Sequence, residues 1–137
     1  MNIPECFYRV SAKALILDDK RRFLLVQEDN GMGELPGGGL DFGEDPSACI
    51  RREIKEEMGL EVTYIKNRPS YFTTSIHTSK EWYAANIIYE VNVENLNFTS
   101  SEECRAIRFF TLEEASRENV FANVREFLKH YKASDHQ

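Results

Sequence analysis

The residues from Asp45 to Gly59 determine their own local structure more firmly than any other part of the chain. Asp45 is a favoured N-cap, and Pro46 suits the first position of a helix. Gly59, directly after Met58, is a natural residue to follow the last helical turn. The sequence therefore predicts a helix between Asp45 and Gly59.

Three carboxylates lie close together on this predicted helix. Glu53, Glu56 and Glu57 are spaced by three and one residues, and at about 100° per residue they point to one side. Their mutual repulsion needs a compensating positive charge or good solvation. One interpretation is a solvated acidic face paired with Arg52 and Lys55. The other is a site for Mg²⁺ or Mn²⁺, which prefer clustered oxygen ligands.

The segment that leads into this helix favours the second interpretation. Residues 31–43 form a glycine-rich stretch that we expect to be a loop, and Glu44 adds a carboxylate just before the helix. Glycine-rich loops expose backbone N–H and C=O groups to phosphates and metals.

The rest of the sequence predicts strands before and after this helix along the chain, and then a final helix. Apolar residues alternate or run together over 8–16, 23–26, 83–93 and 105–110, and residues 60–75 have extended character. Thr111 to Glu114 match a capping box, and the spacing from Val120 to Tyr131 predicts a final amphipathic helix. This order predicts an α/β fold, with a mixed sheet between helices in an α/β/α sandwich.

Length and charge limit the kind of protein. The chain has 137 residues, which fits a single domain over residues 1–137, and a formal net charge of −6. An acidic surface repels nucleic-acid phosphates and anionic lipids, so we expect neither a nucleic-acid nor a membrane partner. A homodimer is among the assemblies that the sequence allows.

Cysteine usage and the N-terminus indicate the compartment. Cys6, Cys49 and Cys104 are odd in number and lack CxxC spacing, which fits unpaired, buried thiols in a reducing environment. The first residues resemble no secretory leader, and no apolar run is long enough to cross a membrane. We therefore expect a cytoplasmic location.

The stretch from Gly38 to Leu60 resembles the Nudix box, Gly-x5-Glu-x7-Arg-Glu-U-x-Glu-Glu-x-Gly-U, where U is a bulky apolar residue. Every fixed position is filled without a gap, by Gly38, Glu44, Arg52, Glu53, Ile54, Glu56, Glu57, Gly59 and Leu60. The match covers 23 residues, and elsewhere only the order of elements is similar. The chain is thus identified as a member of the Nudix hydrolase family, similar to MutT.

The resemblance implies roles for particular residues. Glu53, Glu56 and Glu57 correspond to the carboxylates of the family's metal site, and the carbonyl of Gly37 corresponds to its backbone ligand. Arg52 corresponds to the residue that orients the glutamates by ion pairing.

The loops on either side add further candidates. Gly38 and Glu44 are expected to contact the bound ion or nucleotide, with Glu44 bracing the loop or reaching the metal through water. Many relatives carry one more acidic residue in the loop before the strand at 105–110, where this chain has Glu102 and Glu103. We favour Glu103 over Glu102 as the metal ligand, and a solvated loop is the remaining alternative. Glu53 and Glu103 are the candidates for the general base.

The implied activity is hydrolysis of a diphosphate linkage in a nucleoside diphosphate derivative, with Mg²⁺ or Mn²⁺ as cofactor. The intact box favours an enzyme over a non-catalytic nucleotide sensor. Among small-molecule nucleotide substrates, a nucleoside triphosphate such as an oxidised purine nucleotide is favoured over ADP-ribose or a nucleotide sugar.

The signals for the base-binding residues are weaker than those for the metal site. Asn119 stands where MutT-like relatives carry an asparagine that contacts the purine base, although it is equally a favoured N-cap for the final helix. Phe72, Trp82 and Tyr83 could stack on a base, but we expect core packing for each.

Overall fold

The computed structural model describes residues 5–77 and 82–137. Residues 1–4, on which the expectation about a leader partly rests, lie outside the described part. The strands are β1 (Tyr8–Leu15), β2 (Phe23–Gln27), β3 (Gly33–Glu34), β4 (Gly37–Gly39), β5 (Val62–Ile65), β6 (Tyr71–His77), β7 (Trp82–Val93) and β8 (Ala106–Phe110). The helices are α1 (Pro46–Met58), α2 (Leu112–Ser116), α3 (Ala122–Leu128) and the 3-10 turn η1 (Ala133–Asp135).

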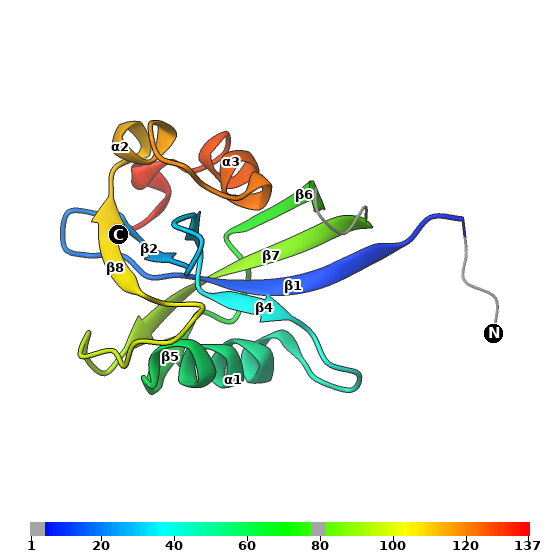
Figure 1. The fold of residues 1–137 in the computed structure, drawn as a ribbon, viewed down its shortest axis with the longest axis horizontal. Helices are drawn as coiled ribbons and strands as arrows, with labels where there is room; N and C mark the ends of the chain where they lie inside the picture. The colour runs from blue at the N-terminus through cyan, green and yellow to red at the C-terminus, as the bar shows by residue number, and fades with distance from the viewer. Residues whose placement is uncertain (1–4, 78–81) are drawn as a thin grey trace.

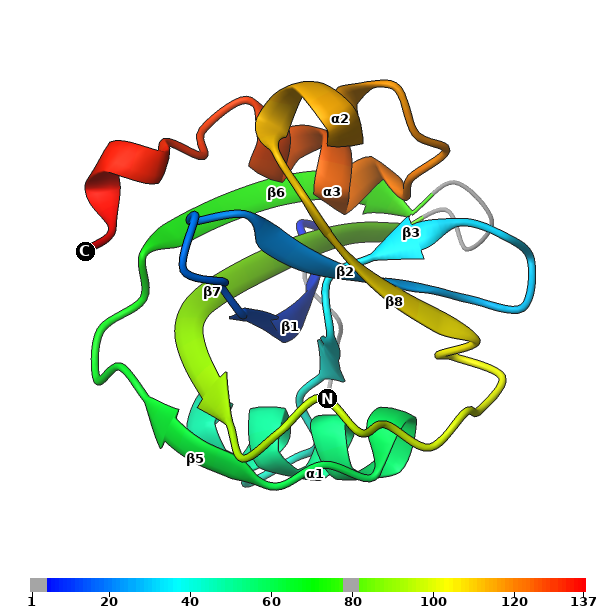
Figure 2. The same ribbon diagram turned by 90° about the vertical axis from the view of Figure 1, so that its left-hand side faces the viewer.

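The strands form two sheets that lie between the helices. The larger sheet has the order β4-β1-β7-β5, with β6 also paired to β7, and the smaller has the order β3-β2-β8. β1 runs parallel to β7, whereas the other pairs are antiparallel, so the larger sheet is mixed. Helix α1 lies on one side of the strands, and α2 and α3 lie on the other (Figures 1 and 2).

The predicted caps position α1 as expected. The side chain of Asp45 accepts a hydrogen bond from the backbone N–H of Ala48, and Gly59 adopts a left-handed φ of 68° at the other end. Ile50 and Ile54 from α1 are fully buried in one core cluster. Burial of this face fixes the orientation of α1 about its own axis, and this orientation determines where the carboxylates of α1 point.

A second core cluster lies under α3. Phe23 and Phe127 meet edge to face with ring centroids 5.1 Å apart. The predicted capping box is present in α2, where Thr111 and Glu114 each accept a backbone N–H hydrogen bond from the other. Among residues 5–77 and 82–137, no helix has the length and apolar character needed to cross a lipid bilayer.

Three sequence expectations need correction. The stretch predicted as a loop contains β3 and β4, because its glycines pair with β2 and β1. The final helix begins at Ala122, and Val120 instead forms a parallel bridge with Gly33. Asn119 is therefore not its N-cap: that position belongs to Phe121, which makes no side-chain capping bond.

Candidate functional site

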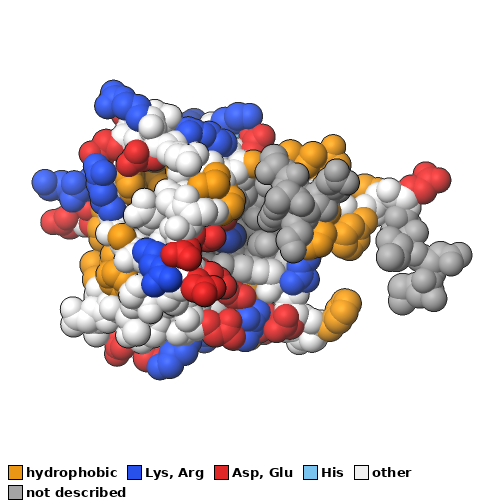
Figure 3. All heavy atoms as spheres, in the orientation of Figure 1, with side chains coloured by type: hydrophobic (Ala, Val, Ile, Leu, Met, Phe, Trp, Pro, Cys, Tyr) orange, Lys and Arg blue, Asp and Glu red, His pale blue; other side chains and the backbone are white. Residues whose placement is uncertain are grey.

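Three carboxylates from two distant parts of the chain converge beside β4. Glu53 and Glu57 come from α1, and Glu103 comes from the loop before β8. Each offers one carboxylate oxygen, and these oxygens lie within 4.8 Å of one another. Figure 3 shows acidic side chains gathered in the middle of the face that lies above α1, with Lys and Arg side chains around them. The fold thus brings Glu103 to the helix glutamates, across 46 residues of sequence from Glu57.

Glu57 is the most buried member of this cluster. Its side chain belongs to a residue only 3% exposed, and its Oε1 accepts a 2.9 Å hydrogen bond from the backbone N–H of Gly37. Burial raises the pKa of Glu57 to about 8, although the nearby charge of Lys13 and the Gly37 hydrogen bond oppose this rise. A buried carboxylate that is poorly solvated is well placed to bind a cation.

Arg52 holds the neighbouring carboxylates in place. Its Nε and Nη2 donate to the two oxygens of Glu44 at 2.8 and 2.9 Å, and its Nη1 donates to Glu53 Oε1 at 2.9 Å. Its Nη2 also donates to the carbonyl of Gly39 at 3.2 Å. Hydrogen bonding to Arg52 holds the pKa of Glu44 at about 2. Arg52 therefore links Gly39 of β4 and Glu44 to Glu53, a member of the carboxylate cluster.

Two other glutamates lie outside the cluster. The side chain of Glu56 is 60% exposed and contacts Arg52 Nη1 at 3.3 Å, although Glu56 lines the same cavity as Glu53. Glu102 is exposed, and its backbone carbonyl accepts from the N–H of Asp29. Between the two loop candidates, the structure thus places only Glu103 with Glu53 and Glu57.

The glycines of β4 make room for the cluster. A Cβ atom on Gly38 would lie 2.6 Å from the carboxyl carbon of Glu53, so a side chain there would push Glu53 away. The carbonyl of Gly37 accepts a long hydrogen bond, 3.4 Å, from Lys13 Nζ. Gly37 thus presents its N–H to Glu57 and its carbonyl to Lys13.

The cluster opens onto a large cavity of about 810 Å³, a volume within the range of ligand sites. Several of its polar lining residues were not predicted from the sequence. They come from β1, β3, β7, α3 and the position directly after β2: Arg9, Ser11, Lys13, Glu28, Glu34, Asn86 and Asn123. A signal for some of them was present in the sequence. Arg9, Ser11 and Lys13 alternate with apolar residues along the first strand, which marks one polar face.

A buried ionic network lies on the wall of this cavity. Lys13 and Glu34 are 7% and 8% exposed, and Lys13 Nζ lies 3.7 Å from Glu34 Oε1. The same Glu34 oxygen accepts 2.7 Å and 2.9 Å hydrogen bonds from Asn123 Nδ2 and from the backbone N–H of Leu35. Asn123 therefore reaches the cavity from the first turn of α3.

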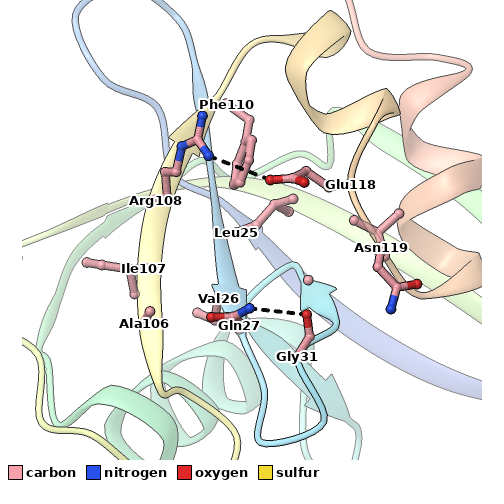
Figure 4. A pocket seen from close by; sticks show the side chains of 12 residues that line it. Leu25, Val26, Gln27, Gly31, Ala106, Ile107, Arg108, Phe110, Glu118 and Asn119 are labelled. Carbon is pink, nitrogen blue, oxygen red and sulfur yellow. Dashed lines mark hydrogen bonds and ion pairs between the residues drawn. The ribbon is translucent and has the colours of Figure 1, made fainter.

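Asn119, the predicted base-contacting residue, lies elsewhere. It is exposed and lines a second, smaller cavity of about 340 Å³ between β2, β8 and the segment before α3 (Figure 4). The two cavities share Val120 in their linings. The structure thus does not bring Asn119 into the cavity that holds the carboxylate cluster.

The aromatic residues also differ from expectation. Phe72 and Tyr83 are 63% and 52% exposed, so the prediction of core packing was wrong for both. Trp82 is partly buried and lines the larger cavity. The three cysteines are unpaired as predicted, and Cys49 and Cys104 are also buried as expected, but the expectation of burial was wrong for Cys6, which is exposed.

The donor set of the cluster fits a hard divalent cation. When ionised, three carboxylates with oxygens within 4.8 Å of one another repel strongly, and burial makes the charged form of Glu57 still less favourable unless a cation offsets it. Oxygen ligands of this kind suit Mg²⁺ or Mn²⁺ better than zinc. Glu53, Glu57 and Glu103 are thus the residues that would hold such an ion, with the Gly37 carbonyl nearby.

Comparison with known proteins identifies the family. The model of the NUDIX domain matches residues 7–131, so the chain belongs to the NUDIX family. The fold also resembles the crystal structure of a MutT protein from Methanosarcina mazei Go1, with a TM-score of 0.79 and 23% identity over 98% of this chain and 100% of that one. The expected MutT-like α/β fold with a mixed sheet is therefore confirmed.

Two curated relatives carry names that state an activity. A nucleoside triphosphatase, NudI, of Enterobacter sp. (strain 638) is 34% identical over 92 residues, which cover 61% of this chain and 64% of that protein. An RNA pyrophosphohydrolase of Ruthia magnifica is 37% identical over 59 residues, which cover 42% of this chain and 33% of that protein. The chain thus matches a third to just under two thirds of the length of these relatives. Their names support the expectation of an enzyme.

Proposed function

We propose that the chain hydrolyses a diphosphate linkage in a nucleoside diphosphate derivative with the help of Mg²⁺ or Mn²⁺, and that its substrate is a nucleoside triphosphate, such as an oxidised purine nucleotide. The observation that carries this proposal is the cluster of Glu53, Glu57 and Glu103 beside a cavity of about 810 Å³. A relative named for nucleoside triphosphate hydrolysis supports the substrate class.

The residues of the cluster would hold the cation, and their neighbours Gly37 and Arg52 hold the carboxylates in position. A divalent cation at the cluster would supply positive charge to the diphosphate oxygens and lower the pKa of a water molecule. Gly37 fixes Glu57 through its N–H group, and Arg52 fixes Glu53 by a 2.9 Å ion pair. Both contacts limit the rotamers of the carboxylates before substrate arrives, which is how a protein prepares a site for charge development.

The proton of the attacking water needs an acceptor. Glu53 and Glu103 are the two candidates, because both place a carboxylate oxygen in the cluster. Glu53 is partly buried and tied to Arg52, whereas Glu103 is exposed on a loop. Burial raises the pKa of Glu53, which makes it a stronger base once it is ionised.

The test is hydrolysis of a nucleotide panel: 8-oxo-dGTP, dGTP, ADP-ribose, a nucleotide sugar and a short RNA with a 5′-triphosphate. We expect activity with Mg²⁺ or Mn²⁺ and the highest kcat/KM for a nucleoside triphosphate. Full activity in excess EDTA would exclude the metal, and a strong preference for ADP-ribose or the sugar would exclude the substrate class. Nucleotide binding without turnover of any of the five would indicate a sensor.

A further inference from the structure

One face of β1 presents positive charge to the larger cavity. Arg9, Ser11 and Lys13 alternate along the strand, and all three line the cavity. β1 pairs with β4, where Ser11 lies opposite Gly39 and Lys13 lies opposite Gly37. Because β4 consists of glycines alone, it has no side chains to cover these polar groups.

Arg9 is fixed at one end of this face. Its Nη1 donates a 2.9 Å hydrogen bond to the carbonyl of Leu40. A Cβ atom on Gly39 would lie 2.4 Å from Arg9 Nη2, so the guanidinium occupies space that only a glycine leaves open. An exposed arginine ordinarily samples many rotamers, but these two features hold this one against the glycine strand.

The charges that line the cavity leave Arg9 unmatched. Its lining carries many carboxylates, namely Glu28, Glu34, Glu53, Glu56 and Glu103, but its cations are Arg9 and Lys13. Lys13 is buried and faces Glu34 and the carbonyls of Leu35 and Gly37. Arg9 has no ion pair with any carboxylate in the described part of the chain, and one N–H group is used on Leu40. Its remaining N–H groups are available to an anion.

We propose that Arg9 binds the phosphate group farthest from the nucleoside, and that it makes the enzyme prefer substrates that end in a charged phosphate. The inference rests on the proposed function and sharpens its substrate class. A guanidinium donates two parallel hydrogen bonds to a phosphate, and these charge-assisted bonds are stronger than those to neutral hydroxyls. A nucleotide sugar or ADP-ribose carries a neutral sugar at that end and gains less from Arg9.

The test compares Arg9→Gln with the wild type on dGTP and on ADP-ribose at saturating Mg²⁺. We expect kcat/KM for dGTP to fall by about 10- to 100-fold, mainly through a higher KM, because a charged hydrogen-bond pair is lost. The value for ADP-ribose should fall by only about two- to fivefold, the effect of losing a typical neutral hydrogen bond. Arg9→Lys should recover part of the loss in kcat/KM for dGTP, since lysine keeps the positive charge but cannot donate two parallel hydrogen bonds. Equal losses on both substrates would overturn the proposal.

Two further variants and one binding measurement complete the design. Arg68→Gln removes an exposed arginine between β5 and β6 and should change neither substrate. Gly39→Ala should displace the guanidinium and reproduce the selective loss of dGTP turnover. If the wild type cleaves no nucleotide, the proposed function fails on its own. Calorimetry with inorganic tripolyphosphate then tests Arg9 directly: weaker binding by Arg9→Gln supports the site, and equal binding overturns it.

Discussion

Two cavities meet at Val120, and they differ in how their charges are matched. In the smaller cavity, Arg108 lies over the ring of Phe110 and forms a 3.6 Å ion pair with Glu118 (Figure 4). The positive and negative charges that line this cavity therefore neutralise each other. In the lining of the larger cavity, carboxylates outnumber cations, and two of these carboxylates, Glu53 and Glu103, lie together with the buried Glu57. A cavity with satisfied charges needs no ligand for its stability. One with an excess of carboxylates gains from a cation, and through it from an anionic substrate.

The largest expected effect concerns the most buried carboxylate of the cluster beside the larger cavity. Glu57→Gln should reduce kcat by orders of magnitude, because the amide keeps an acceptor for the Gly37 N–H but loses the negative charge of the cluster. The fold should survive, since side-chain volume and that hydrogen bond are kept. Steady-state kinetics with thermal unfolding of the same sample would measure both. Turnover within a few-fold of wild type would show that the cluster is not the metal site.

A smaller expected effect on substrate selectivity distinguishes which of the two cavities contacts the base. Asn123 lies in the larger cavity and donates to Glu34, whereas Asn119 lines the smaller one. We expect Asn123→Ala to change the ratio of kcat/KM between 8-oxo-dGTP and dGTP by about 1–3 kcal/mol, the cost of leaving a buried polar group unpaired.

Asn119→Ala is the matched control for this experiment. It should leave the selectivity ratio unchanged, and because Asn119 is not an N-cap, it should also avoid the roughly 1 kcal/mol loss of stability typical of a removed cap. A loss of selectivity in Asn119→Ala alone would move base recognition to the smaller cavity.

The same comparison shows which features were predictable from the sequence. Helix α1 and its carboxylates were, because Asp45, Pro46 and Gly59 act on their own neighbours. Helical spacing also predicted Glu53, Glu56 and Glu57 on one side, and the structure brings Glu53 and Glu57 together but leaves Glu56 largely exposed. These are local signals, and they hold whatever the rest of the chain does.

The features that failed depend on distant pairing. β4 forms because its three glycines pair with Ser11, Ala12 and Lys13, although glycine has a low preference for strands. Asn119 has the chemistry of an N-cap, but its carbonyl instead accepts from the N–H of Gly33 and the helix starts later. No local signal reports these contacts.

The burial of the polar face of β1 was not predicted from the sequence, for a related reason. A polar residue that alternates with apolar ones is ordinarily read as facing solvent. Lys13 is nevertheless buried, because β4 pairs with β1 at this position and Glu34, in β3, forms an ion pair with Lys13. Alternation identifies the polar face correctly but does not tell whether water or a cavity covers it.

The smallest expected effect concerns the carboxylate at the rim of the larger cavity. Glu56 is largely exposed and contacts Arg52 at 3.3 Å, a contact that is worth little at a surface. Its negative charge also opposes ionisation of Glu53, so removing it relieves repulsion of a few tenths of a kcal/mol. Glu56→Gln should therefore leave the metal-free melting temperature unchanged or slightly raised.

Glu61→Gln is the control for this experiment. Glu61 is equally exposed and forms a 2.5 Å ion pair with Lys55, which does not belong to the carboxylate cluster, so the loss of this pair should lower the melting temperature slightly. If Glu56→Gln destabilises the metal-free protein more than Glu61→Gln does, the ion pair of Glu56 with Arg52 outweighs its repulsion of Glu53. Thermal unfolding of both variants in EDTA would decide.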